Sequence, residues 1–544
     1  MASVKFQRKE FEKHIKITKE VEEKISLFGT PLQSLNNEEI EIEIYPNRPD
    51  LLSMHGFIRS FKAFLGKDES LKKYSVSKPE KNYLVMIDQS VKEVRPFTSC
   101  AIMKNLSLDN EKIKEIINIQ EKLHATIGRN RKKVAIGIYP LEKIALPITY
   151  KALSPQDIKF IPLESEKEMN ALQILQKHPA GRAYSHLLEG YKKFPVFIDS
   201  KMNILSMPPI INSNETGKIN ESTKEVFIEC SGFNKEVVNK TLNLIVTTLA
   251  DIGGKIYSME LVYEKRNREI TPNLTSEKIK ISLENINKLL GISLKESEVE
   301  RLLKKMGIDY KNKTAQIPAW RTDILHEVDI IEDIAIAYGY NKFIPEIPNI
   351  YTSSEEQHEE KIKEKLSDVL VGLGLIEISS YHLIKEREAQ IMRIKEKIEV
   401  ENSKTEYKIL RLNLLIPALR ILSENKDHEY PQKIFEIGTT FSLSKNKIRE
   451  NESLIIALSP SNFTEAKQIL DYIAELFYFD YSIKESLHPN LINGRNAKIM
   501  IKNNEIGYIG EVAPETLRAW NIKMPISVIE ISLEEIFKIA SLSG

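Results

Sequence analysis

The chain has 544 residues and a mass of 62.5 kDa, which at about 150 residues per domain is enough for roughly three or four domains. With 42 % hydrophobic residues the composition is that of a globular protein, which excludes a mainly disordered chain. Lys and Arg number 78 against 77 Asp and Glu, which excludes a strongly basic coat for nucleic acid, and two cysteines, Cys100 and Cys230, are too few for a disulfide framework.

Two observations concern membranes. No stretch of the sequence approaches the roughly 18 consecutive apolar residues that a membrane span requires. The N-terminal residues alternate charged with apolar side chains and lack the apolar core of a signal peptide. We therefore expect a soluble, cytoplasmic protein with no membrane contact.

The first segment predicts a small α/β domain. A polar helix is expected over residues 11–27, and residues 40–44 alternate Ile with Glu, as in a strand with one buried face. The two prolines of residues 46–50 make a rigid turn, and a helix with one apolar side follows over 51–65. The Lys- and Ser-rich stretch 67–81 has the composition of a linker.

The next region has a mixed α/β pattern. Helices are expected over 107–125 and 235–252, and strands over 134–138 and 225–230. Within this region, residues 205–213 end an apolar run with small hydroxyl and amide groups. Such a segment either lines a polar pocket or forms a proline-stiffened loop over the core, and both interpretations stay open.

Residues 271–340 predict a compact unit that resembles a winged helix. Its helices are expected over 283–290, 294–306 and 323–338, with a strand over 315–318 before the third helix. The third helix is acidic, which argues against a DNA-binding regulator, because acidic side chains repel phosphate.

A proline-containing linker over 345–354 precedes the largest unit, in which 497–501 and 506–512 predict the two strands of a hairpin. The fold class we predict is α+β and multidomain, with mixed α/β domains in the N-terminal half. The expected domain boundaries are 1–81, 82–265, 266–345 and 351–544.

Three carboxylates of the third helix fall on one face. Asp329, Glu332 and Asp333 are spaced i, i+3 and i+4, and Asp323 lies at the predicted start of the same helix. Like charges so close together repel, so a cation or a basic partner would stabilise them, and an all-oxygen ligand set favours Mg²⁺ over zinc. The spacing alone leaves two interpretations open, a Mg²⁺ site and a solvated acidic face.

Several motifs of nucleotide and ester chemistry are missing. The sequence has no G-x-x-x-x-G-K-S/T loop, no G-x-G-x-x-G fingerprint and no G-x-S-x-G elbow. Sequence alone therefore assigns no phosphate-binding loop and no nucleophilic triad.

At several motifs the chain resembles the β subunits of phenylalanyl-tRNA synthetase of the archaeal and eukaryotic type. The matching segments are 47–53 with Arg59, 131–137, 178–182, 205–213 and 321–340. Together they indicate a resemblance over nearly the whole chain. It implies a class II aminoacyl-tRNA synthetase in which two α and two β chains form a heterotetramer.

In that family the α chain binds ATP and phenylalanine and acylates tRNA-Phe, while the β chain carries a catalytic-like domain without this chemistry. The resemblance therefore implies that residues 351–544 form a class II antiparallel sheet that lacks an ATP site. Ile434 stands where class II enzymes have the ATP-binding arginine of an F-R-x-E strand. We expect no catalytic residue for acylation in this chain, which would act as the non-acylating part of a phenylalanine–tRNA ligase.

The resemblance also implies two sites. The family's metal-bearing domain, here 266–345, implies Mg²⁺ bound by Asp323, Asp329, Glu332 and Asp333. The family's second domain, here 82–265, hydrolyses tyrosine wrongly attached to tRNA-Phe, and the matching editing candidates are Asn212, Ser213, Glu229 and Ser231.

The sequence departs from the family pattern near the editing candidates, mildly at Glu229, Ser231 and Asn234 and more strongly at two other places. Phe233 replaces a hydroxyl-bearing residue, and Tyr139 with Pro140 replaces a usual His-Asp pair. Because Ser231 and Phe233 are two residues apart on a predicted strand, we expect both to face the same side, so that the Phe233 ring narrows the pocket and slows editing.

Two functions compete with the ligase subunit. The first is a stand-alone tRNA-binding or editing module with no obligate partner, and the second is the DNA-binding regulator, which the acidic helix disfavours. A size measurement with and without an α chain separates the ligase subunit from the stand-alone module.

Overall fold

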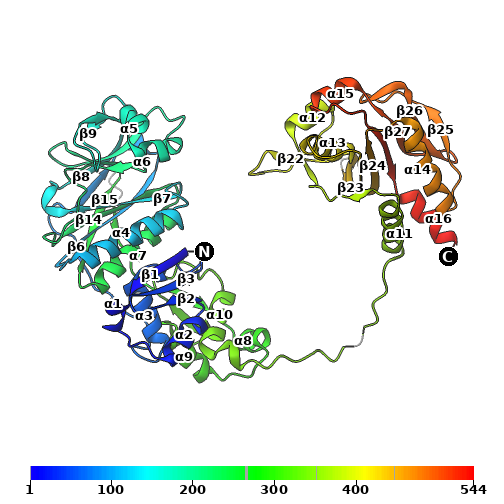
Figure 1. Ribbon diagram of the computed structural model, residues 1–544. Coiled ribbons are helices and arrows are strands. Elements are labelled where there is room, and N and C mark those ends of the chain that lie inside the picture. Colours follow the sequence, from blue (N-terminus) through cyan, green and yellow to red (C-terminus); the bar gives the residue numbers. More distant parts are fainter. Residues whose placement is uncertain (1, 264–267, 351, 446, 544) are drawn as a thin grey trace. The chain divides into compact units, whose positions relative to one another are not determined.

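The computed structural model describes residues 2–263, 268–350, 352–445 and 447–543, with side chains as far as Ile539. The chain divides into two compact units, Met1–Glu346 and Ile347–Gly544 (Figure 1). The division falls at the predicted proline-containing linker. In the part of the chain that is described, no helix is long and apolar enough to cross a membrane.

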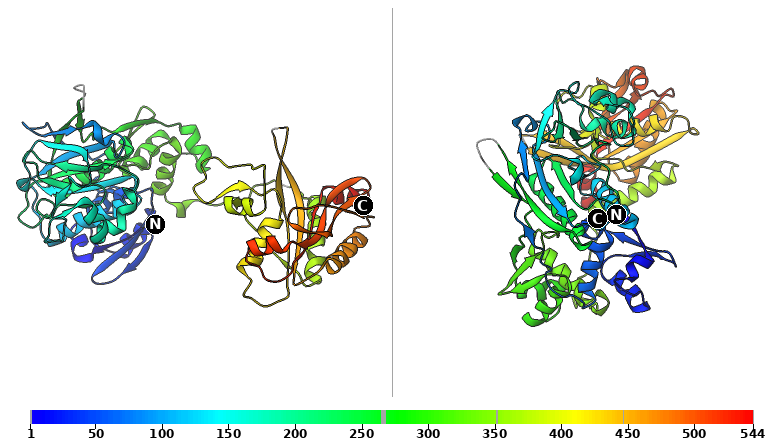
Figure 2. Two further views of the ribbon diagram at one scale, coloured as in Figure 1. Left: turned by 90° about the horizontal axis from the view of Figure 1, so that it is seen from above. Right: turned by 90° about the vertical axis from the view of Figure 1, so that its left-hand side faces the viewer.

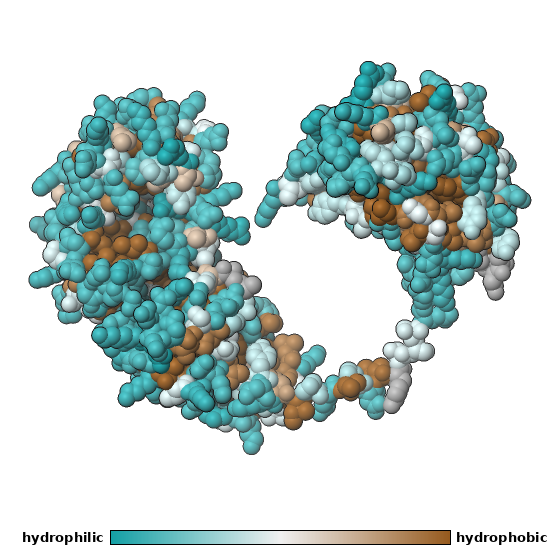
Figure 3. Space-filling model, in the orientation of Figure 1, coloured by the Kyte–Doolittle hydropathy of each residue, from teal (hydrophilic) through white to brown (hydrophobic). Residues whose placement is uncertain are grey.

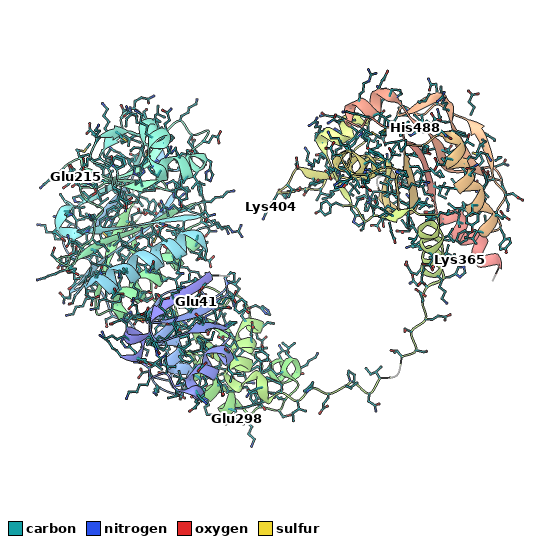
Figure 4. All side chains as sticks on the ribbon, in the orientation of Figure 1. Glu41, Glu215, Glu298, Lys365, Lys404 and His488 are labelled. Atoms are coloured by element: carbon teal, nitrogen blue, oxygen red, sulfur yellow. The ribbon has the colours of Figure 1, made fainter. Side chains whose placement is uncertain are left out.

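The chain opens with a three-stranded antiparallel sheet in the order β1-β3-β2. In β3 the isoleucines are buried and the glutamates lie on the other face, as the alternation predicts; Glu41 is labelled in Figure 4. The prediction of one helix over 11–27 is wrong, because the Thr18 side chain accepts the Val21 backbone N–H and so begins a second helix. The elements are β1 (Ala2–Gln7), α1 (Arg8–Glu12), α2 (Lys19–Leu27), β2 (Leu32–Leu35), β3 (Glu39–Ile44), the 3-10 turn η1 (Pro49–Leu51) and α3 (Met54–Phe64).

An eleven-stranded sheet forms the middle of the first unit, in the order β13-β12-β11-β8-β5-β15-β6-β14-β7, with β4 and β16 also paired to β15. Strand β5 runs parallel to β8 and β15, and helices α4 and α7 pack on β6, β14 and β7 (Figure 1). The strands are β4 (Val76–Ser77), β5 (Leu84–Ile87), β6 (Phe97–Lys104), β7 (Val134–Pro140), β8 (Ile148–Leu153), β11 (Phe194–Ile198), β12 (Ile204–Met207), β13 (Ile211–Asn212), β14 (Val226–Gly232), β15 (Lys255–Val262) and β16 (Arg268–Thr271). The helices are α4 (Asn110–Ala125), α5 (Ala171–Lys177), α6 (Pro179–Tyr184) and α7 (Lys235–Asp251), and β9 (Lys159–Phe160) pairs with β10 (Met169–Asn170).

Three helices and a small sheet in the order β17-β19-β18 complete the first unit (Figure 2). The third helix begins at Glu327 and not at the predicted residue 323, because His326 is its N-cap and Asp323 pairs with Arg321 instead. The elements are β17 (Glu277–Lys280), α8 (Leu283–Leu290), α9 (Glu296–Lys305), β18 (Asp309–Lys311), β19 (Thr314–Ile317), α10 (Glu327–Tyr338) and the 3-10 turn η6 (Tyr340–Lys342).

One hydrophobic core runs through the three domains predicted for the first unit. It includes Phe57 of α3 and Ile330 of α10, both fully buried. Arg59 of α3 adds polar contacts, since its Nη1 lies 2.5 Å from Asp251 of α7 and its guanidinium 4.5 Å from the centre of the Trp320 ring. The boundaries near 81 and 265 therefore do not separate compact units, and they stay predictions about the sequence.

The second unit is built on a seven-stranded sheet in the order β20-β23-β24-β28-β27-β26-β25, antiparallel except between β20 and β23. Helices α11, α14 and α16 cover one face, and α12, α13 and α15 the other. The hairpin predicted near 497–512 is confirmed as β26 and β27. The elements are α11 (His358–Gly372), β20 (Ile376–Glu377), β21 (Leu383–Lys385), α12 (Glu386–Ile391), β22 (Tyr407–Leu410), α13 (Leu415–Glu424), β23 (Gln432–Ser444), β24 (Lys447–Ser459), α14 (Phe463–Leu476), β25 (Ser482–Glu485), β26 (Leu491–Ile501), β27 (Asn504–Val512), α15 (Pro514–Ala519), β28 (Ser527–Ser532) and α16 (Glu534–Ser543).

The face of the molecule drawn in Figure 3 is largely hydrophilic, whereas both cysteines lie inside. Cys100 of β6 and Cys230 of β14 are fully buried and unbonded to each other. Burial raises the pKa of both thiols. The two side chains belong to different apolar clusters, one on each face of the sheet.

Candidate functional site

The candidate Glu229 lies in the middle of β14, between the neighbouring strands β6 and β7. It is paired with Cys100 on one side and with Gly137 on the other. Ile228 and Cys230 point into the core beneath α7, so the Glu229 side chain points to the opposite face of the sheet. The strand thus buries Glu229, which is only 2 % exposed.

A cavity of about 190 Å³ opens over this face, and two of the four editing candidates, Asn212 and Glu229, line it. Its other walls include His124 of α4, Arg131 from the loop before β7, and His178 at the start of α6. Two larger cavities, of about 560 and 540 Å³, lie beside α3 and contain none of the predicted site residues.

Tyr139 of β7 reaches the same face, and its hydroxyl lies between the two candidates. Its Oη is 3.3 Å from Asn212 Oδ1 and 3.2 Å from Glu229 Oε1. The ring is fully buried and stacks on Phe227, with 5.7 Å between the ring centres. A phenol has one proton, so it donates to one of these oxygens at a time. The three polar side chains therefore form a short buried chain beside the cavity.

Burial raises the pKa of Glu229 to about 8, although the Tyr139 hydroxyl, the Arg95 guanidinium and the Ser231 hydroxyl favour the ionised form. A carboxyl group that is protonated at neutral pH can donate to Tyr139 Oη while Tyr139 donates to Asn212 Oδ1. The other oxygen, Glu229 Oε2, is buried and has no partner in hydrogen-bond geometry among the described residues.

Gly137 makes the close approach of Tyr139 and Glu229 possible. A Cβ atom at residue 137 would lie 2.2 Å from Tyr139 Oη and 2.6 Å from Glu229 Oε1, both far inside van der Waals contact. Residues 137 and 139 share one face of β7 because they are two apart. The Gly-x-Tyr spacing thus leaves room for the hydroxyl and the carboxyl over the same backbone position.

The two serine candidates make contacts within the fold. Ser213 Oγ accepts the backbone N–H of Glu215 at 3.3 Å. Ser231 Oγ accepts from Arg95 Nε at 3.2 Å, and Arg95 Nη2 donates to the Ser231 carbonyl at 2.7 Å. Neither serine lines the cavity. Their role in editing stays a prediction, which the geometry supports less well than that of Asn212 and Glu229.

The expectation that Phe233 narrows the pocket is wrong. Strand β14 ends at Gly232, so the alternation of side chains does not continue to residue 233. Phe233 is 44 % exposed, its ring centre lies 5.3 Å from the Arg95 guanidinium, and it does not line the cavity. The ring covers Arg95 from the solvent side.

The two histidines of the cavity wall are held by backbone groups. His124 Nε2 accepts the Ile136 N–H at 2.9 Å, and burial lowers the pKa of this imidazole. His178 Nδ1 accepts the Ala180 N–H at 3.2 Å, which leaves its Nε2 to donate to the Leu163 carbonyl at 3.1 Å. The fold thus holds both rings in place, and they shape the wall of the cavity.

The predicted metal ligands separate into a buried pair and two outlying groups. In the buried pair, Arg321 Nη2 lies 2.7 Å from Asp323 Oδ2 and Arg321 Nη1 lies 2.8 Å from Asp333 Oδ2. Asp50 is paired in the same way with Arg48 at 2.8 Å, and the Arg48 charge also acts on Asp323 and Asp333. We call these five residues the aspartate–arginine network. It joins the motif at 47–53 to the motif at 321–340.

Burial and the arginines act in opposite directions on the network. For Asp323, burial raises the pKa, but Arg321 and Arg48 outweigh it and the pKa is lowered. For Asp333, burial is the largest effect and the pKa is raised in spite of Arg321. A guanidinium occupies the place between the two carboxylates where a metal ion would have to bind.

Asp329 and Glu332 lie outside the network. Asp329 Oδ2 accepts the backbone N–H groups of Leu325 and His326, both at 2.8 Å, and so closes the start of α10, while Glu332 is exposed. In the described ranges, no group of three or more His, Cys, Asp or Glu side chains is arranged to hold a metal ion. The four side chains do not fit Mg²⁺ in this arrangement, and the Mg²⁺ assignment stays a prediction.

Sequence reasoning did not assign three residues that shape these clusters, Gly137, Tyr139 and Arg321. Gly137 lies in the predicted strand 134–138 and Tyr139 directly follows it; the signal for both was their spacing of two residues, which places them on the same face because the strand continues to Pro140. The signal for Arg321 was its position two residues before Asp323, a spacing that here gives a bidentate ion pair.

Comparison with known proteins identifies the family. Three family models match the chain: the B3/4 domain over residues 81–247, the tRNA synthetase B5 domain over 279–340 and the phenylalanyl tRNA synthetase beta chain CLM domain over 344–533. The phenylalanine–tRNA ligase beta subunit of Thermococcus sibiricus is 38 % identical over 506 residues, which cover 90 % of each chain. The chain belongs to the family of phenylalanine–tRNA ligase β subunits.

Further relatives of this β-subunit family agree. The phenylalanine–tRNA ligase beta subunit of Archaeoglobus fulgidus is 36 % identical over 528 residues, 94 % of each chain. The crystal structure of an N-terminal fragment of the phenylalanyl-tRNA synthetase β subunit from Pyrococcus horikoshii superposes with a TM-score of 0.59 at 38 % identity, covering 62 % of this chain and 99 % of the fragment. The resemblance inferred from the motifs and the α+β multidomain fold class are confirmed.

Proposed function

We propose that this chain is the β subunit of a phenylalanine–tRNA ligase and that, with an α subunit, it supports the ATP-dependent attachment of phenylalanine to tRNA-Phe. The observation that carries the proposal is the 36–38 % identity to such β subunits over at least 90 % of both chains. The proposed partners are an α chain, in a complex of two α and two β chains, and tRNA-Phe. ATP and phenylalanine would bind on the α chain.

The second unit supports a non-acylating role. Its mostly antiparallel sheet suits a class II-like fold, and Ile434 of β23 is buried where such enzymes have an ATP-binding arginine. Two residues on, Glu436 Oε1 accepts from Arg411 Nη1 at 2.7 Å, and Arg411 is itself only 1 % exposed. This arginine is used within the fold, so it is not available to a nucleotide phosphate.

Reconstitution tests the proposal. The purified chain is expected to bind a matching α subunit in gel filtration and to restore phenylalanylation of tRNA-Phe, while the chain alone shows no exchange of pyrophosphate with ATP in the presence of phenylalanine. Exchange activity of the chain alone would contradict the assignment. A monomer that ignores α chains would favour a stand-alone tRNA-binding or editing module.

We further propose that the cavity beside β14 hydrolyses Tyr-tRNA-Phe. Phenylalanine and tyrosine differ by one hydroxyl, which an apolar pocket rejects by only about 100-fold, so a second, hydrolytic site is useful. Asn212 and Glu229 support this role because both line the cavity. The test is the deacylation of Tyr-tRNA-Phe by the complex with α.

The deacylation test has a matched pair of variants on adjacent residues. Asn212→Ala is expected to slow hydrolysis at least about tenfold, because it removes a polar group from the cavity wall. Ser213→Ala is the control, since that hydroxyl contacts Glu215 and not the cavity. Equal losses in both variants would assign the effect to folding of the loop and would count against editing at this cavity.

The finer parts of the proposal concern the third predicted domain. Three helices and a three-stranded sheet support a winged-helix-like unit within 266–345, and the matched ranges 81–247 and 279–340 overlap the proposed domains.

Mg²⁺ binding is tested by metal analysis of the complex. Metal that is retained by the unaltered protein and lost in Asp329→Ala/Glu332→Ala would support the predicted ligand set.

A further inference from the structure

We propose that the Tyr139 hydroxyl occupies the position beside the cavity where the hydroxyl of a bound tyrosyl group would be recognised, so that Tyr139 sets the specificity of this cavity. The inference rests on the proposed editing function, since it concerns the same cavity. It makes Tyr139 a specificity-determining residue and leaves the hydrolytic step itself to other groups.

Tyr139 already uses the hydrogen-bond partners that a ligand hydroxyl would need. Asn212 and Glu229 both line the cavity, and one oxygen of each lies within 3.3 Å of Tyr139 Oη. The hydroxyl of a tyrosyl ligand has the same donor and acceptor capacity as Tyr139 and would need the same partners. These two oxygens are already used by the protein's own phenol.

Tyr139 is also fixed in place by its packing. Its side chain has no solvent exposure and stacks on Phe227 within an apolar cluster of the sheet. Beneath it, Gly137 provides the space that the hydroxyl and the Glu229 carboxyl share. Because interiors are close-packed, the ring cannot turn aside to admit a ligand hydroxyl without opening a cavity elsewhere.

The contacts of Tyr139 affect how well the cavity can distinguish a tyrosyl from a phenylalanyl group. A site whose polar groups pair with a ligand hydroxyl can reject the analogue without that hydroxyl by about 10,000-fold, whereas an apolar site discriminates weakly. Asn212 Oδ1 and Glu229 Oε1 both lie within 3.3 Å of Tyr139 Oη, so a ligand hydroxyl meets two oxygens that already have a protein partner, and the cavity should discriminate weakly between tyrosyl and phenylalanyl groups. The raised pKa of Glu229 agrees with this arrangement, since a protonated carboxyl group can donate to Tyr139 Oη.

The experiment removes one oxygen atom. In the complex with α, the initial rates of deacylation of Tyr-tRNA-Phe and Phe-tRNA-Phe are measured for the unaltered chain and for Tyr139→Phe. The ratio of the two rates is expected to rise at least about tenfold in the variant, because a tyrosyl hydroxyl can then reach Asn212 and Glu229. A double variant, Tyr139→Phe/Asn212→Leu, is expected to lose most of this gain.

The matched control is Tyr150→Phe. Tyr150 is also fully buried in the same cluster, and neither tyrosine itself lines the cavity, but the Tyr150 hydroxyl donates to the Arg95 carbonyl at 2.8 Å and not to the cavity-lining Asn212 and Glu229. The rate ratio should not change in this variant. A rise as large as that of Tyr139→Phe would overturn the inference, because loosening of the sheet would then explain both results.

A binding measurement separates the inference from the proposed hydrolysis. Binding of p-cresol and of toluene to the full chain is compared by titration, with the folded state of each variant checked by circular dichroism. Tyr139→Phe is expected to favour p-cresol over toluene about tenfold more than the unaltered chain does. This gain without any hydrolysis supports the inference while the editing proposal fails. An unchanged preference for p-cresol overturns the inference.

Discussion

The first unit buries two groups of carboxyl side chains, and the two groups differ in the partners that their oxygens have. In the aspartate–arginine network, Asp50, Asp323 and Asp333 each have a guanidinium nitrogen within 2.8 Å. Glu229 has the Tyr139 hydroxyl as its neighbour, and the guanidinium of the nearby Arg95 donates to Ser231 and to the Arg131 carbonyl. The first arrangement carries ion pairs, whereas the second favours a neutral acid.

The difference separates structural from ligand-binding chemistry. Carboxylates paired with arginine hold distant segments together, and their oxygens are no longer free for a metal or a ligand. A buried acid without an ion pair, such as Glu229, can instead hydrogen-bond to a hydroxyl group beside a cavity. An acidic residue that belongs to a matching motif, such as Asp333, is therefore not a ligand-binding residue for that reason alone.

Removing an arginine from the aspartate–arginine network should have the largest effect on stability. Arg321→Met leaves Asp323 and Asp333 buried without their partner, and the free energy of unfolding of the first unit should fall by about 3–5 kcal/mol. Urea unfolding measures the change. Arg301→Met, on the exposed side of α9, is the control and should change stability by less than about 0.5 kcal/mol. Similar small losses in both variants would refute a stabilising role of the network.

The titration of Glu229 tests whether this residue is buried as a neutral acid. Its pKa of about 8 in the folded chain lies above the ordinary value of 4.5, so the folded state binds the extra proton and stability falls as pH rises from about 4.5 to about 8. The difference in unfolding free energy between the unaltered chain and Glu229→Gln should decline by up to about 1.4 kcal/mol per pH unit in that window and then level off. Urea unfolding from pH 5 to 9 provides the measurement, and a difference that is independent of pH would contradict the raised pKa.

Gly137 tests how closely the acid and the phenol are packed. Gly137→Ala places a methyl group 2.2 Å from Tyr139 Oη, and the resulting overpacking should cost about 1–3 kcal/mol in thermal or urea unfolding. Gly372→Ala in α11, where no atom lies within 4 Å of the new methyl group, should be neutral or stabilising by up to about 1 kcal/mol. A neutral Gly137→Ala would show that this strand pair can relax.

The smallest expected effect is at Phe233. Phe233→Ala removes a ring that covers the Arg95 guanidinium, which should cost no more than about 1 kcal/mol of stability. The rate of deacylation of Tyr-tRNA-Phe should stay within about twofold, because the ring does not line the cavity. A large acceleration of hydrolysis would restore the interpretation that the ring narrows the pocket.

Local patterns predicted much of the fold. The alternation over 40–44, the helix over 283–290 and the hairpin near 497–512 are confirmed, because each depends on periodicity or turn residues within a short window. The errors lie at helix starts, where side-chain contacts decide. Thr18 begins a second helix inside the predicted helix over 11–27, and His326 rather than Asp323 caps α10.

The candidate site was predicted less completely. Asn212 and Glu229 line the cavity, whereas Ser213 and Ser231 do not, and a resemblance between motifs cannot show which side chains of a segment face a cavity. The four acidic residues of the predicted metal site share a sequence region but not a common centre, because Arg321 competes for two of them. Such competition depends on tertiary contacts that spacing along the chain does not record.

The two cysteines can report when β14, which carries Glu229, and its neighbour β6 open to solvent. Cys100 and Cys230 lie on the paired strands β6 and β14, and neither thiol is exposed. Thiol reagents react with the thiolate, so reaction in the native state requires that these strands open to solvent. Labelling rates at increasing urea would separate local fluctuation from global unfolding. The chain therefore contains native reporters of the dynamics of its central sheet.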